Sequence, residues 1–156
     1  MGREPEAEVL AAIPHRPPFL FVDRIVECDT TAGGRIRTEY EVREDEIFVG
    51  GHYPGNPIMP GVLICEAILQ SGAILATRLD EASGEEPVPV LSRLKDARFR
   101  RAVKPGEVLE MEAECLEHVA GAMQMRGTAR VAGKTAVTVS FTSASVPASR
   151  LNSGGE

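Results

Sequence analysis

The sequence predicts an α+β domain in which an antiparallel sheet wraps around one long helix. The helix is predicted by residues 60–77, which are mostly apolar, hold one ionisable side chain, Glu66, and begin with a proline suited to a first helical turn. The sheet is predicted by several segments in which apolar and polar residues alternate. Because the helix is apolar nearly all round, we expect the sheet to enclose it.

Alternation along the chain predicts the individual strands. In residues 36–42, Ile36, Thr38, Tyr40 and Val42 face one way and charged residues face the other, as in a half-buried strand. The same period recurs in residues 109–115, 123–131 and 137–141, and two further apolar segments, 19–26 and 88–103, are also predicted strands. Gly121 and the Ala-Gly-Lys at 132–134 supply turns, so antiparallel hairpins are the expected connections.

The remaining segments complete a single domain. Residues 4–12 could form a short helix, and 82–87 read as a loop after the long helix. A length of 156 residues suits one compact unit, which we place at residues 1–146. The small and polar residues 147–156 are expected to be a disordered tail.

Composition excludes several functions. A formal net charge of -6 argues against general nucleic-acid binding, which favours a basic surface. Cys28, Cys65 and Cys115 lie far apart without metal-ligand spacing, so neither a disulfide framework nor a zinc site is expected. Glu66 and Gln70 near the middle of the apolar helix disfavour membrane insertion. The acidic N-terminus lacks the pattern of a signal peptide, which predicts a cytoplasmic protein.

The chemistry is concentrated in "GHYPGNPIMPGVLICEAILQ", residues 51–70. His52 lies in a Gly/Pro loop and would be a neutral base. Glu66, in an apolar helix with Gln70 one turn later, would be a protonated acid able to donate its proton. The first amides of the helix, beginning at Gly61, carry partial positive charge that could stabilise a carbonyl oxygen as it becomes negative.

This motif, together with "IPHRPPFLFVDRI" at 13–25 and "KDARFRRAVKPGEVL" at 95–109, resembles the (3R)-hydroxyacyl-[acyl carrier protein] dehydratases of bacterial fatty-acid synthesis. The resemblance covers about residues 9–143 and implies the hot-dog fold. It implies that His52 of one subunit faces Glu66 of another across a dimer interface, and that amides near Gly61 contact the thioester carbonyl. Glutamate at position 66 is similar to the branch that dehydrates without isomerising the double bond.

The resemblance implies a hydro-lyase that converts a (3R)-hydroxyacyl thioester into a trans-2-enoyl thioester. His52 would take the C2 proton and Glu66 would help the C3 hydroxyl leave as water. No metal or cofactor is expected, because these steps require neither and the three histidines offer no recognisable ligand spacing. The substrate would be carried on the phosphopantetheine of acyl carrier protein. The subunits would form a homodimer or a trimer of dimers, and the product could serve fatty-acid or lipid A synthesis. His15 and Arg16 are assigned a structural role.

An apolar tunnel for the acyl chain is expected beside the helix. The candidate lining residues are Phe48, Val49, Ile58, Met59, Val62 and Leu63. Val49 and Gly50 replace the family's usual Phe and Gln, and Tyr53 replaces its usual Phe. These departures leave chain-length preference and gating undetermined.

A basic strip runs through residues 93–104 of this otherwise acidic chain. Arg98, Arg100, Arg101 and Lys104 are the candidates for docking the acidic carrier or its phosphate. A solvated strand face explains the same charges equally well. The alternatives to a dehydratase are a thioesterase of the same fold, a hydratase acting on coenzyme A thioesters, and an acyl-binding domain without turnover.

Overall fold

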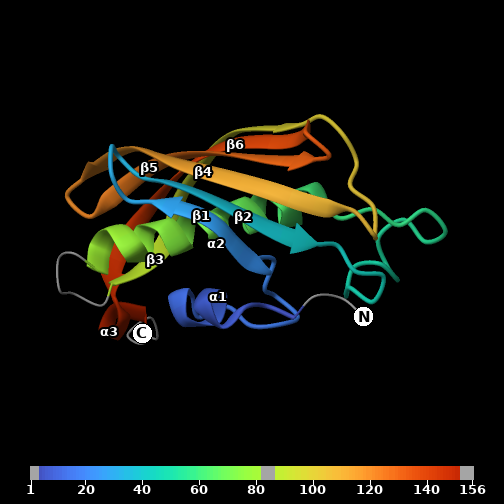
Figure 1. The fold of residues 1–156 in the computed structure, drawn as a ribbon, viewed down its shortest axis with the longest axis horizontal. Coiled ribbons are helices and arrows are strands. Elements are labelled where there is room, and N and C mark those ends of the chain that lie inside the picture. The colour runs from blue at the N-terminus through green and yellow to red at the C-terminus, as the bar shows by residue number, and fades with distance from the viewer. Residues whose placement is uncertain (1–3, 82–86, 152–156) are drawn as a thin grey trace.

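The computed structural model describes residues 4–81 and 87–151. In chain order the elements are α1 (Ala7–Ala12), β1 (Arg24–Asp29), β2 (Arg35–Glu41), α2 (Gly61–Asp80), β3 (Pro87–Phe99), β4 (Val108–Val119), β5 (Ala122–Val131), β6 (Lys134–Pro147) and α3 (Ala148–Leu151). The strands form one antiparallel sheet in the order β1-β2-β4-β5-β6-β3. Figure 1 shows the sheet curving over α2, with α1 on the other side of that helix. The predicted α+β class and the enclosed helix are confirmed.

Each alternating segment forms a strand with its apolar positions facing the helix. In β2, Ile36, Thr38 and Tyr40 are at most 1% exposed, whereas the charged residues between them are exposed or half-buried. The strands β4, β5 and β6 keep the same alternation over the predicted positions. A side-chain period of two therefore identified the buried face of the sheet correctly.

Two tight turns connect β4, β5 and β6. The turns hold Ala120-Gly121 and Ala132-Gly133, and both residues of each pair have positive φ, between 48° and 75°. Positive φ at both central positions is the geometry that matches the twist of a two-residue hairpin, and glycine adopts it without steric cost. The predicted hairpins are confirmed.

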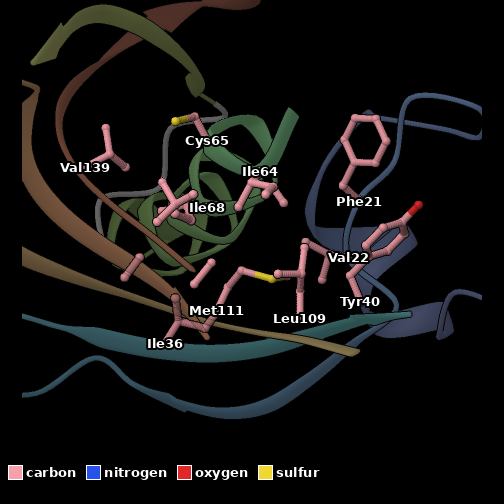
Figure 2. Packing of buried hydrophobic residues seen from close by; sticks show 14 of the residues in the cluster. Phe21, Val22, Ile36, Tyr40, Ile64, Cys65, Ile68, Leu109, Met111 and Val139 are labelled. Carbon is pink, nitrogen blue, oxygen red and sulfur yellow. The ribbon is translucent and has the colours of Figure 1, made fainter. Parts of the chain in front are cut away.

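The core lies between α2 and the inner face of the sheet. Figure 2 shows Ile64 and Ile68 on the side of α2 that faces Met111 and Leu109 of β4. The packing is tight at Gly127 in β5, where an added Cβ would lie 2.1 Å from a methyl carbon of Ile68. A glycine in the sheet therefore allows α2 to approach the backbone of β5.

The helix α2 is long and apolar enough to cross a membrane, but more than half of it is buried inside the protein. Its buried positions lie on several sides, which is the pattern of an enclosed core helix. The choice of a buried helix over a membrane span is confirmed.

The first strand begins later than predicted. Residues 19–23 are not paired as a strand, and β1 starts at Arg24. The Phe21 N–H instead donates to the side chain of Gln70 on α2, at 2.7 Å. At the other end, β6 extends to Pro147 and Ala148–Leu151 form α3. The rest of the predicted tail and most of the predicted 82–87 loop lie outside the described residues.

Candidate functional site

The loop between β2 and α2 carries His52. The His52 N–H donates to the Phe48 carbonyl at 2.8 Å, and the ring Nδ1 lies 2.8 Å from the Ile58 carbonyl oxygen. Because a carbonyl oxygen only accepts hydrogen bonds, Nδ1 must carry the hydrogen in this contact. In the neutral ring the lone pair is then on Nε2, which can act as a base.

The carboxylate of Glu66 lies in the second turn of α2 and its side chain is 25% exposed. Gln70, which is 1% exposed, accepts from Phe21 N–H and donates to the Phe19 carbonyl at 3.2 Å. This fixes the orientation of its amide, so its Nε2 also donates to Glu66 Oε1 at 3.0 Å. Since Oε1 accepts, Oε2 is the oxygen available to hold a proton.

A cavity of about 80 Å³ opens beside Glu66. Its lining residues are His15, Glu66, Leu69, Gln70, Ala73, Pro89, Leu91, Phe141 and Ser143. The wall is mostly apolar, and the carboxyl group of Glu66 is its only acidic group. Such a cavity can hold hydrocarbon next to a proton donor.

His15 lines this cavity, although only a structural role was predicted for it. Its Nε2 lies 3.7 Å from Glu66 Oε1, and its Nδ1 is buried without a hydrogen-bond partner within the described part of the chain. His52 is not among the residues that line the cavity. A single chain therefore brings Glu66 together with His15, not with His52.

The start of α2 agrees with the prediction. The helix begins at Gly61, directly after Pro60. A Cβ at position 61 would lie 2.6 Å from two ring atoms of Phe99, so a larger residue would collide with that ring. The N–H groups of Leu63 and Ile64 donate to the Pro60 carbonyl at 2.9 Å and 3.1 Å, so those of Gly61 and Val62 are the ones at this helix start that could donate to an oxygen of a ligand.

The six predicted tunnel residues lie in the loop that carries His52 and in the first turn of α2, and none of them lines the cavity beside Glu66. Phe48 and Met59 are buried in the core, and Val49 and Leu63 pack against it. Ile58 is half-buried and Val62 is 70% exposed. Their role as a tunnel lining stays a prediction.

The predicted docking residues do not share one environment. Arg98, Arg100 and Lys104 are exposed. Arg101 is half-buried and its guanidinium donates to Glu107 at 2.6 Å, so part of its charge is balanced within the chain.

No group of three or more His, Cys, Asp or Glu side chains that could hold a metal ion occurs in residues 4–81 and 87–151.

Part of the cavity wall had a signal in the sequence. Leu69 and Ala73 follow Glu66 by three and seven residues, which places them on its face of the helix. Leu91, Phe141 and Ser143 carry no comparable signal, because they reach the cavity only through the pairing of β3 with β6.

Comparisons with known proteins identify the family and support the fold. Residues 13–140 match the model of the FabA-like domain family. The chain is 39% identical to 3-hydroxyacyl-[acyl-carrier-protein] dehydratase FabZ of Nitratidesulfovibrio vulgaris, over 88% of each chain. It is 42% identical to the protein of that name from Caulobacter vibrioides, over 86% of this chain and 84% of the relative. It is 48% identical to the protein of that name from Chloroflexus aggregans, over 69% of this chain and 72% of the relative.

Two solved structures share the fold. The dehydratase heterocomplex ApeI:P from Xenorhabdus doucetiae superposes with a TM-score of 0.76 at 16% identity, over 92% of this chain and 94% of that one. A hypothetical thioesterase from Streptococcus pneumoniae, solved with coenzyme A, has a TM-score of 0.63 at 15% identity, over 90% and 92%. The expected hot-dog fold is thereby confirmed. The family match and these relatives show that the chain belongs to the FabA-like domain family.

Proposed function

We propose that this protein dehydrates (3R)-hydroxyacyl-[acyl carrier protein] to trans-2-enoyl-[acyl carrier protein] in fatty-acid biosynthesis. Relatives that carry the dehydratase name are 39% to 48% identical over most of the chain. The observation that carries the mechanism is the contact of His52 Nδ1 with the Ile58 carbonyl, which leaves Nε2 as a base. Dehydration to the enoyl thioester needs only an acid, a base and an oxyanion site.

His52 would start the reaction. Its Nε2 takes the proton from C2 of the substrate, and the electron pair moves onto the thioester carbonyl oxygen. The amides at the start of α2, near Gly61, would stabilise the negative charge on that oxygen, because they combine free N–H groups with the positive end of the helix dipole. The Phe99 ring packs against Gly61, so this position of the helix start has no room for a larger side chain.

Glu66 would complete the reaction as the acid. Its Oε2 gives a proton to the C3 hydroxyl, which leaves as water while the C2–C3 double bond forms. Gln70 keeps Oε1 occupied and so presents Oε2 to the substrate. His52 then loses its extra proton to solvent and Glu66 takes one up from solvent, which restores both starting protonation states. Neither a metal nor a bound cofactor is needed for these steps.

A second copy of the chain would supply the missing half of the site. The strand β3 is an edge of the sheet, and it exposes Leu91, Leu94 and Phe99. A long edge strand with exposed apolar residues favours pairing with another strand. Because Leu91 also lines the cavity of Glu66, a copy paired along β3 would lie over that cavity and could bring its own His52 there. We therefore propose a homodimer with two shared sites, which could associate further into a trimer of dimers.

The carrier would approach the exposed basic residues. Arg98, Arg100 and Lys104 are exposed near the start of α2, and they would attract an acidic carrier or the phosphate of its phosphopantetheine. Arg101 is a weaker candidate because it is paired with Glu107. The acyl chain would lie in the cavity beside Glu66, against Leu69 and Ala73. All three cysteines are free, in keeping with a reaction located in the cytoplasm.

The test is an assay of enoyl thioester formation from a (3R)-hydroxyacyl thioester on acyl carrier protein. We expect His52→Ala and Glu66→Gln to stay folded and to lose about 10²-fold or more in kcat, the usual scale for an acid or base. Thioester hydrolysis without enoyl product would instead indicate a thioesterase. Equal turnover on coenzyme A thioesters would indicate a hydratase of that pool. Acyl binding without any product would indicate a binding domain.

A further inference from the structure

Four polar side chains form a cluster at the end of β2, in which Asp23 and Tyr40 are buried and the other two are half-buried, and none of them lines the cavity of Glu66. They are Asp23, Tyr40, Arg43 and Glu46. Asp23 is 2% exposed, and the Arg43 guanidinium donates to its Oδ1 at 2.5 Å. The other nitrogen of Arg43 donates to Glu46 Oε1 at 3.3 Å, and the Tyr40 hydroxyl donates to the same oxygen. The guanidinium thus bridges two carboxylates.

Asp23 is buried and Arg43 is half-buried, so both charged groups lose contact with water on folding. Removing an aspartate and an arginine from water costs several kcal/mol per ion before their attraction is counted, and apolar replacements are often as stable. None of the four side chains lines the cavity of Glu66, and the proposed dehydration uses none of them. Burial alone would lower the pKa of Arg43, but the hydrogen bond and charge of Asp23 outweigh it and raise that pKa. The Arg43 guanidinium therefore keeps its positive charge at neutral pH.

The bridge lies at the start of the segment that carries His52. Residues 42–60 contain neither helix nor strand, so their path is not set by a helix or by strand pairing. The Glu46 carbonyl accepts from Val49 N–H at 3.0 Å, and the Phe48 carbonyl accepts from His52 N–H at 2.8 Å. Phe48 is 7% exposed and anchors the middle of the segment in the core. Glu46 is thus connected to the backbone of His52 through two successive turns.

We propose that Arg43 is a positioning residue, which joins Asp23 to Glu46 and thereby places the loop that presents His52. The proposal rests on the proposed role of His52 as the base. Asp23 itself is held by the Glu41 N–H at 2.7 Å and by its own N–H bond to the Glu39 carbonyl at 2.8 Å, so it is a rigid anchor on the sheet. Lysine could not replace the arginine, because one ammonium group lacks the planar fork that reaches both carboxylates.

The test compares Arg43→Lys with Arg24→Lys. Arg24 makes a similar ion pair, with Glu39 at 2.7 Å, but this pair joins the neighbouring strands β1 and β2. For Arg43→Lys we expect kcat to fall by about 10-fold to 100-fold, the scale for a small misplacement of a catalytic group. KM and the thermal midpoint should change little, because lysine keeps a charge beside Asp23. Arg24→Lys should retain the parent kcat within about two-fold, as expected for a surface change. An unchanged kcat in Arg43→Lys would overturn the proposal.

A second variant and a second measurement keep the outcome interpretable. Glu46→Ala removes the loop side of the bridge and leaves the pair of Asp23 and Arg43 intact, so it should lower kcat as Arg43→Lys does; parent-like kcat would overturn the proposal. NMR of ¹³C-labelled histidine reports on the His52 ring without turnover, with its signal assigned from His52→Ala. We expect that signal to shift or broaden in Arg43→Lys but not in Arg24→Lys. An unmoved signal would overturn the positioning role even if the dehydratase assignment itself failed.

Discussion

Replacing Gly127 by alanine tests how closely α2 approaches the sheet. The added Cβ would lie 2.1 Å from Cγ2 of Ile68 and 3.2 Å from the Glu112 carbonyl oxygen. Carbon atoms pack best at about 3.5–4.0 Å, so the first contact is too short by about 1.4 Å or more. Overpacking of this kind costs about 1–3 kcal/mol. We expect urea unfolding to show a loss of that size, with a thermal midpoint lower by roughly 2–4 °C per kcal/mol.

Two comparisons make this prediction specific to the contact. Gly50→Ala is the control, because a Cβ at that position has no heavy atom within 4 Å and should leave stability unchanged. Ile68→Leu moves the branch of the side chain away from Cβ and should recover part of the loss in the double variant. Ile68 is two residues from Glu66, so displacement of α2 should also lower dehydratase activity. If Gly127→Ala unfolds within about 0.5 kcal/mol of the parent, the ordinary range of surface changes, the reasoning is refuted.

Three further results are expected. Burial, and then the hydrogen bond to Glu46, raise the pKa of Tyr40, so the folded protein keeps a proton that the unfolded chain releases near pH 10. The free energy of unfolding should therefore fall above about pH 10, and it should fall more steeply than that of Tyr40→Phe, by up to about 1.4 kcal/mol per pH unit. Urea unfolding that gives the same pH dependence for the parent and for Tyr40→Phe would contradict this. Burial raises the pKa of the Cys65 and Cys115 thiols, so mass spectrometry at pH 8 should find slower alkylation of the native than of the urea-unfolded protein; equal rates would contradict it. Gln70→Met should lose about 1–3 kcal/mol in urea unfolding because the buried Phe21 N–H loses its acceptor, and parent-like unfolding would argue against that bond.

Local pattern in the chain was enough to predict the main elements of this protein. Alternation in residues 36–42 identified the buried face of β2, and the apolar residues after Pro60 predicted a core helix starting at Gly61. These inferences succeed because the period of a strand or helix is set by its own backbone. Gln70 was also predictable as a partner of Glu66, since residues four apart share one face of a helix.

Contacts between distant segments were decided by packing alone. The sequence does not show that residues 19–23 leave the sheet so that the Phe21 N–H can fix the amide of Gln70. It also does not show that His15 reaches the cavity of Glu66, or that Ser143 closes it. Asp23 and Glu46 lie far apart along the chain, and the fork of Arg43 joins them only after β1 and β2 have paired. Such contacts depend on how whole elements pack against each other, and no period within a single segment encodes that arrangement.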